Sequence, residues 1–288
     1  MHTIRVPAST SNLGAGFDCL GLALDLWLEV RLLAGPGPPT YHGTLTGLDE
    51  RRDLLLRTFR DAAGEAASGW TLEARSEIPL GKGLGSSAAA LVAGAGVAQL
   101  ARGEALDPQR VFEAASAAEG HPDNAAPAAF GGLILAAGLP ERLSLHPSLG
   151  IALAVPELGV DTHAARRLLP AQVARGVAVD QAARAAALVL GLTEGDPGLI
   201  RHGMDDQLAV PHRKHLIAGF DEARQAGEAA GAFAVTISGA GSSLLAVSGR
   251  ELTRRVAQAM AEALARNGNP ATPMTPAVSE RGVMAVGG

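Results

Sequence analysis

Hydrophobic and polar residues alternate along residues 24–33, where Leu or Val takes every even position and mostly polar residues take the odd ones. This period of two predicts a strand with one apolar face. Residues 51–67 instead carry apolar side chains at helical spacing opposite a charged face, with Gly69 as a stop, which predicts an amphipathic helix. A further strand is expected at residues 70–75.

The next stretch predicts a loop followed by a buried helix. Residues 81–85 are rich in glycine and predict a loop, and residues 86–100 are rich enough in alanine to form a buried helix. Asp107 and Pro108 have the residue types of a helix cap and a first helical position. Short apolar strands are expected at residues 130–137 and 151–155.

Beyond residue 158 the chain becomes rich in Ala, Arg and Glu. We expect helices at residues 162–169, 177–192, 213–230 and 251–267, and strands at residues 233–238, 243–247 and 278–286, the last one closing a sheet. Strands and helices are interspersed without a regular βαβ cadence, so the pattern favours an α+β fold. We expect two domains, residues 1–155 and 156–288.

Composition narrows the class of protein. A net charge of −5 argues against binding to a nucleic-acid backbone. The single cysteine, Cys19, forms no intrachain disulfide and fits a reducing compartment. The N-terminus has no apolar signal core, and the longest nearly apolar tract, residues 88–101, is too short to span a bilayer. The expectation is a cytoplasmic protein that binds neither nucleic acid nor membrane.

A glycine- and serine-rich loop follows a predicted strand and opens the buried helix. Its glycines allow successive backbone N–H groups to surround an anion, and the helix N-terminus adds its dipole, so the loop predicts a phosphate cradle. A serine here can cap the helix or bind magnesium. The alternative is a plain glycine turn with a serine cap. The loop is not a Walker A motif, since the lysine lies among the glycines. The predicted nucleotide-binding residues are Pro79, Leu80, Gly81, Lys82, Gly83, Leu84, Gly85, Ser86, Ser87, Ala88 and Ala89.

This loop resembles the ATP-binding motif of the galactokinase, homoserine kinase, mevalonate kinase and phosphomevalonate kinase (GHMP) superfamily. Residues 7–21 (PASTSNLGAGFDCLG) resemble its first motif, and their sequence is close to that of the homoserine kinases. Residues 236–243 (TISGAGSS) resemble its third motif. The resemblance implies a ribosomal-S5-like N-terminal domain, a ferredoxin-like C-terminal domain, ATP and Mg²⁺ as cofactors, L-homoserine as substrate and a homodimer.

The resemblance also implies roles for single residues. Magnesium would be held by Ser87 and Glu119, with Glu113 on the same helix as the alternative to Glu119. Asn12 and Asp18 would contact the substrate, Asp18 at its ammonium or its hydroxyl. Asn124 lies in a loop that borders the active site in this superfamily. The residues singled out for catalysis are Asn12, Asp18 and Asn124.

Two arginines match substrate-binding residues of homoserine kinases. An amino-acid substrate needs a guanidinium for its carboxylate, and Arg166 and Arg213 fill that role in the resemblance. The match at Arg213 is looser, because His212 stands where the pattern usually has Tyr. A general base is not obvious in the sequence; Asp18 is a candidate, but an orienting role is favoured for it. His121, in the loop before Asn124, is interpreted as a turn histidine satisfied by the backbone.

Two other functions stay open. Another kinase of this superfamily would phosphorylate mevalonate or a diphosphocytidyl sugar alcohol, and would differ in its acceptor pocket. A ligand-binding regulator would have lost catalysis, but the loop glycines and serines and Glu119 are all present, which argues against it.

Overall fold

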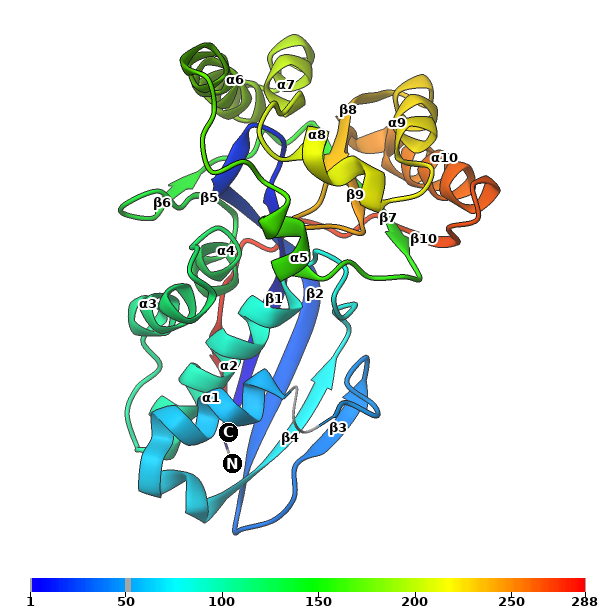
Figure 1. The fold of residues 1–288 in the computed structure, drawn as a ribbon. Helices are drawn as coiled ribbons and strands as arrows, with labels where there is room; N and C mark the ends of the chain where they lie inside the picture. Colours follow the sequence, from blue (N-terminus) through cyan, green and yellow to red (C-terminus); the bar gives the residue numbers. More distant parts are fainter. Residues whose placement is uncertain (1, 50–52, 288) are drawn as a thin grey trace.

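A computed structural model describes residues 2–49 and 53–287 and contains two sheets (Figure 1). The larger sheet runs in the order β11-β1-β2-β4-β3, and β5 and β6 extend it from β2. All pairs are antiparallel except β3 with β4. Its strands are β1 (His2–Asn12), β2 (Gly16–Ala34), β3 (Thr40–Gly43), β4 (Trp70–Ser76), β5 (Leu133–Leu135), β6 (Glu141–Leu143) and β11 (Met284–Val286).

Helices cover one face of this sheet (Figure 1). The central helix α2 (Ser86–Ala101) contacts β1, β2, α1 and α3 and is buried over most of its length. Its small Ala and Gly side chains permit this packing on several sides at once. The other elements of this layer are α1 (Leu54–Ala63), the 3₁₀ helix η2 (Gly64–Gly69), α3 (Pro108–Glu119) and α4 (Ala125–Phe130).

The smaller sheet is antiparallel, in the order β10-β7-β9-β8. Alternate residues of β7 belong to two different cores: Leu153 joins the core of the larger sheet, and Ala154 joins a second core that includes Phe220 and Met260 of two covering helices. The elements are β7 (Leu149–Pro156), β8 (Ala232–Ile237), β9 (Leu244–Gly249), β10 (Ala271–Met274), α9 (Phe220–Ala229), η4 (Arg250–Leu252) and α10 (Thr253–Arg266).

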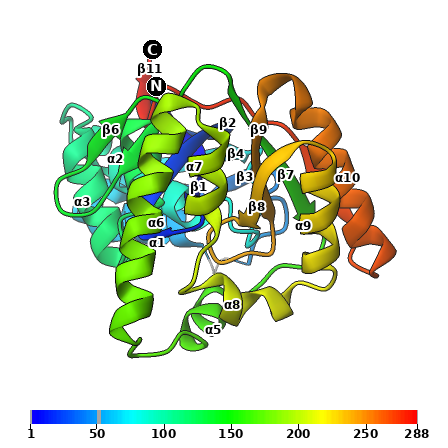
Figure 2. The ribbon, with the colours of Figure 1, turned by 90° about the horizontal axis from the view of Figure 1, so that it is seen from above.

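Between β7 and α9 the chain forms helices that lie over the junction of the two sheets (Figure 2). They are α5 (Thr162–Arg167), α6 (Arg175–Glu194), α7 (Pro197–Met204), α8 (Val210–Arg213) and η3 (Lys214–Leu216). By length and hydropathy α6 passes a test for a membrane-crossing helix. Its Gln181 and Leu188 are nevertheless buried in the protein, and Arg184 pairs with Asp180 and Asp205. These contacts indicate a helix packed on a globular domain.

The structure confirms the α+β class and most predicted elements. The helix start at Asp107 is confirmed, since its carboxylate accepts from the backbone N–H groups of Gln109 and Arg110. Other expectations differ in detail. The helix expected at residues 51–67 begins at Leu54 and ends in η2, while its residues 51 and 52 lie outside the described residues. The strand expected at residues 130–137 spans only β5, because Phe130 ends α4.

One expected helix was wrong, and one strand was not expected. Residues 213–230 do not form one helix, because α8, η3 and a turn at Gly219 (φ +80°) precede α9. Residues 2–12 had been given no strand, yet they form β1. The division at residue 155 stays a prediction. It falls inside β7, which belongs to the smaller sheet, and β11 brings the chain back to the larger one.

Candidate functional site

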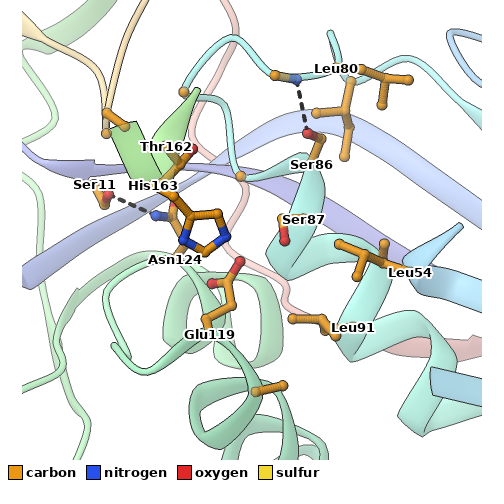
Figure 3. Close-up of a pocket in the computed structure, with 18 of the residues that line it drawn as sticks. Ser11, Leu54, Leu80, Ser86, Ser87, Leu91, Glu119, Asn124, Thr162 and His163 are labelled. Carbon is orange, nitrogen blue, oxygen red and sulfur yellow. Dashed lines mark hydrogen bonds between the residues drawn. The ribbon is translucent and has the colours of Figure 1, made fainter. Parts of the chain in front are cut away.

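A cavity of about 770 Å³ contains most of the predicted site residues (Figure 3). Apolar side chains line one part of it, including Leu28, Leu45, Leu48, Leu54, Ile78 and Leu91. The glycine-serine loop lines a second part. Polar and charged residues line a third, including Asn12, Asp18, Glu119, Arg166 and Arg213. The cavity thus combines an apolar region, a candidate phosphate cradle and a charged region.

The glycine-serine loop joins β4 to the N-terminus of α2. Six of its eleven predicted residues line the cavity: Leu80, Gly81, Gly83, Gly85, Ser86 and Ser87. Leu84, Ala88 and Ala89 are fully buried and anchor the loop in the core. The Lys82 ammonium donates to the main-chain carbonyl of Glu157. Pro79 is half-buried outside the lining.

Two glycines of the loop permit close contacts with the other two motifs. A Cβ on Gly83 would lie 2.1 Å from the carbonyl oxygen of Ser238, and one on Gly85 would lie 2.0 Å from Oγ of Ser9. The Ser238 hydroxyl donates to the Gly83 carbonyl at 2.6 Å, and its oxygen lies 2.8 Å from Oγ1 of Thr10. The three sequence motifs therefore meet at one place, which fixes the path of the loop.

Glu119 at the end of α3 presents a buried carboxylate to the cavity. Its Oε2 is buried and has no hydrogen-bond partner. Burial raises the pKa of Glu119, and the nearby His121 and the Ser87 hydroxyl partly offset this rise. Figure 3 shows Glu119 and Ser87 facing the same space. Glu113 is exposed and accepts from Gln109, so the structure brings Glu119 and not Glu113 to the cavity.

A buried acceptor without a protein donor fits a bound cation. Oxygen ligands from a carboxylate and a hydroxyl suit Mg²⁺ beside nucleotide phosphates. A second group of candidate ligand atoms, from Asp18, His121 and Asp123, lies within 4.8 Å of one another. These three side chains already have strong partners: Asp18 pairs with Arg166, and His121 pairs with Asp123. Glu119 is therefore the better candidate for the metal.

Asp18 and Arg166 form a bidentate ion pair. Nη1 and Nη2 of Arg166 donate to Oδ2 and Oδ1 of Asp18 at 2.9 and 2.7 Å. This pair raises the pKa of Arg166. It joins β2 to α5, two elements nearly 150 positions apart. The two residues that the sequence assigned to a substrate's charged groups thus lie together.

Asn12 holds the backbone around this pair. Its Nδ2 donates to the Gly239 carbonyl at 2.9 Å, and its Oδ1 accepts from the Asp18 N–H at 3.0 Å. Both Asn12 and Asp18 have a positive φ, a backbone conformation that few residues other than Gly, Asn and Asp adopt. The expected direct contact of Asn12 with substrate stays a prediction, since both polar groups of its side chain have protein partners.

Arg213 is a buried cation at the charged end of the cavity, with 3% of its surface exposed. Within the described part of the chain its guanidinium reaches two main-chain carbonyls, of Ala165 at 3.3 Å and Gly239 at 3.4 Å, and no carboxylate. It also lies 5.3 Å from the centre of the Phe17 ring, whose other guanidinium neighbour is Arg166 at 5.7 Å. Burial and then Arg166 lower the pKa of Arg213. A cation so placed favours an anionic ligand.

Several cavity residues had been given no role, and one was interpreted wrongly. Nδ1 of His121 lies 2.7 Å from the Asp123 carboxylate and not against a main-chain group, and this contact raises the pKa of His121. Thr162 and His163 of α5 also line the cavity (Figure 3). In this helix the sequence motif indicated a role for Arg166 alone.

Asn124 is fixed between two serines of β1. Its Oδ1 accepts from Ser9 at 3.0 Å, and its Nδ2 donates to Ser11 at 2.8 Å. Figure 3 shows the bond with Ser11 and places Asn124 on the side of the cavity that holds Glu119. The polar residues of the first motif thus orient the loop that follows α3.

Comparisons with known proteins agree with this arrangement. The family models for the GHMP kinases N-terminal domain and C-terminal domain match residues 53–132 and 185–269. Homoserine kinase of Gloeobacter violaceus is 39% identical over 90% of this chain and 91% of its own, and that of a Picosynechococcus species is 37% identical over 89% and 90%. The crystal structure of homoserine kinase from Cytophaga hutchinsonii has a TM-score of 0.85 and 28% identity, covering 99% of this chain and 97% of that one. The chain belongs to the homoserine kinases of the GHMP kinase superfamily.

Proposed function

We propose that this protein transfers the γ-phosphoryl group of ATP to the side-chain hydroxyl of L-homoserine, giving O-phospho-L-homoserine for threonine biosynthesis. The observation that carries the proposal is the charged end of the cavity. It offers a carboxylate, Asp18, and two guanidiniums, Arg166 and Arg213, next to a phosphate cradle. An α-amino acid presents the complementary ammonium and carboxylate.

The nucleotide occupies the rest of the cavity in this proposal. The adenosine fits the apolar region around Leu45, Leu48 and Leu54, and the phosphates fit the loop from Gly81 to Ser87. The backbone N–H groups of the loop and the N-terminus of α2 stabilise phosphate charge. The six lining residues contribute by contact, and Leu84, Ala88 and Ala89 hold the loop in the core. Lys82 fastens the loop through the Glu157 carbonyl, and Pro79 lies at its start.

Ser87 and Glu119 would hold Mg²⁺. When bound, the ion neutralises charge on the phosphates during transfer. Glu119 is suited to this role because its carboxylate is buried and has an oxygen without a protein partner. Asp18 and Asn124 would orient the substrate, whose hydroxyl oxygen bonds to the γ-phosphorus as the bond to ADP breaks. The proton passes to the transferred phosphate, so no side chain acts as a base.

The acceptor is tested by a panel of alcohols. Mevalonate also has a carboxylate, but it lacks the ammonium that Asp18 would bind. We expect ADP release to depend on L-homoserine and to be far slower with mevalonate. A regulator of the same fold would show no release of ADP that depends on an added alcohol.

We further propose that the enzyme acts in the cytoplasm as a homodimer. The resemblance to homoserine kinases supports both statements, and the net charge of −5 and single cysteine fit a cytoplasmic small-molecule enzyme. Sedimentation of the purified protein measures the oligomeric state, and a monomer at all concentrations would contradict this part of the proposal.

A further inference from the structure

A buried pair of polar side chains, Gln181 and Asp206, lies behind the charged end of the cavity. Gln181 comes from the middle of α6, and Asp206 from the segment between α7 and α8. Their exposed fractions are 6% and 4%, and neither lines the cavity. Nε2 of Gln181 donates to Oδ1 of Asp206 at 2.7 Å.

Asp206 determines the start of the short helix that ends in Arg213. Its Oδ1 accepts from the N–H of Leu208 at 3.0 Å, and its Oδ2 accepts from those of Ala209 and Val210 at 2.7 and 2.6 Å. The carbonyl of Ala209 in turn accepts from the Arg213 N–H at 3.0 Å. A single carboxylate therefore fixes the turn from which the Arg213 side chain projects.

Gln181 connects that turn to the first motif. Its Oε1 accepts from the Gln207 N–H at 2.9 Å, and its Nε2 also donates to the Ala15 carbonyl at 3.3 Å. Ala15 lies in the turn between β1 and β2 and leads directly to Phe17 and Asp18. One amide thus sets the position of the Arg213 turn relative to the segment that carries Asp18.

The charge on Asp206 also acts on the arginine. Among the described residues no Lys or Arg forms an ion pair with Asp206, whose acceptors are taken by the neutral donors already named. Burial and Arg166 lower the pKa of Arg213, and Asp18 and then Asp206 partly offset this lowering. Asp206 therefore favours the charged guanidinium without competing for the hydrogen bonds that a ligand would use.

We propose that Asp206 and Gln181 are positioning residues for the substrate carboxylate, acting through Arg213 and its distance from Asp18. The inference rests on the proposed function, since it takes Arg213 as the carboxylate ligand. If these two residues only stabilised the fold, their replacement would lower the activity toward all substrates equally. If they position Arg213, their replacement lowers the activity only toward substrates that have a carboxylate.

The test compares Asp206→Asn with Asp205→Asn. The neighbouring Asp205 loses the same charge but pairs with Arg184 at the surface, which makes it the matched control. L-homoserine is compared with 3-aminopropan-1-ol, which has the hydroxyl and the ammonium but no carboxylate. We expect Asp206→Asn to raise the KM for L-homoserine about 10- to 100-fold, with little change in the KM for ATP. The kcat/KM for 3-aminopropan-1-ol should stay within about twofold, and Asp205→Asn should change neither substrate.

A double-mutant cycle with Arg213→Met completes the test. If Asp206 acts through Arg213, the double variant loses no more kcat/KM for L-homoserine than Arg213→Met alone. Equal losses for both substrates, or additive losses in the cycle, would overturn the inference. If Asp206→Asn does not fold, Gln181→Met provides the same comparison. A wild type that does not use L-homoserine would refute the proposed function instead, and an effect of Arg213→Met without one at Asp206 or Gln181 would refute only the positioning role.

Discussion

Replacing Arg213 by Met should lower activity and leave stability unchanged or higher. The guanidinium is buried, and its partners are two main-chain carbonyls at 3.3 and 3.4 Å. Burial of a charge without a carboxylate partner costs free energy, which the lowered pKa of Arg213 reflects. Met keeps much of the side-chain volume without the charge. We expect the free energy of unfolding to be unchanged or to rise by about 1–3 kcal/mol.

The loss of activity follows from the same burial. Hydrogen bonds to charged groups contribute about 1.5–3 kcal/mol each. Losing the carboxylate contact should cost about 2–4 kcal/mol, which lowers the kcat/KM for L-homoserine about 30- to 700-fold. Most of this loss should be in the KM for L-homoserine, because the contact is present before and during transfer.

The assay is ADP release at varied L-homoserine and saturating ATP, together with denaturant unfolding of the same preparations. Arg167→Met is the control, since Arg167 is exposed on the same helix as Arg166. The control should show wild-type kinetics. A loss of stability by Arg213→Met with an unchanged KM for L-homoserine would show that Arg213 is a structural cation and would refute this reasoning.

Other variants test the remaining parts of the site. Glu119→Gln should lower turnover by about 100-fold or more and raise the Mg²⁺ concentration needed, while homoserine binding measured by calorimetry persists; normal turnover would remove Glu119 from the metal site. Gly83→Ala should lower the melting temperature far more than Gly81→Ala, because a Cβ meets a carbonyl at 2.1 Å only at Gly83; similar melting temperatures would contradict the close contact. The hydrogen bond with Asp123 raises the pKa of His121 above 6.5. The stabilisation of the folded protein by this hydrogen bond is therefore complete below pH 6.5 and is lost as the pH rises through the raised pKa of His121. The difference in unfolding free energy between wild type and His121→Asn should shrink as the pH rises above 6.5, and a constant difference would exclude the linkage.

The sequence predicted the elements that have a clear local signal. The strand within β2 alternates, and the α3 start has its cap, so local rules were sufficient there. β1 was missed because its residues 6–12 are buried on both faces, which removes the alternation. Its polar Ser9 and Thr10 resemble a loop in sequence, and they are satisfied by partners distant in the chain, Asn124 and Ser238.

The candidate site was likewise predicted where the sequence has a local motif and missed where residues distant in the chain come together. Motifs located the phosphate loop, Glu119 and both arginines, all of which line the cavity except for Pro79, Lys82 and the buried loop anchors. The pairing of Asp18 with Arg166 joins residues nearly 150 positions apart, so no local pattern predicts it. The turn at Gly219 was hidden because apolar residues on both sides of it continue a helical spacing.

The most direct test of the account is the ratio of kcat/KM for L-homoserine to that for mevalonate, measured with the wild-type protein at saturating ATP and Mg²⁺. Both acceptors have a carboxylate and a primary hydroxyl, and only L-homoserine has the ammonium that fits Asp18. The account predicts a ratio of about 1,000 or more, since a site that hydrogen-bonds a substrate group strongly rejects an analogue that lacks this group. Comparable values for the two acceptors would contradict it.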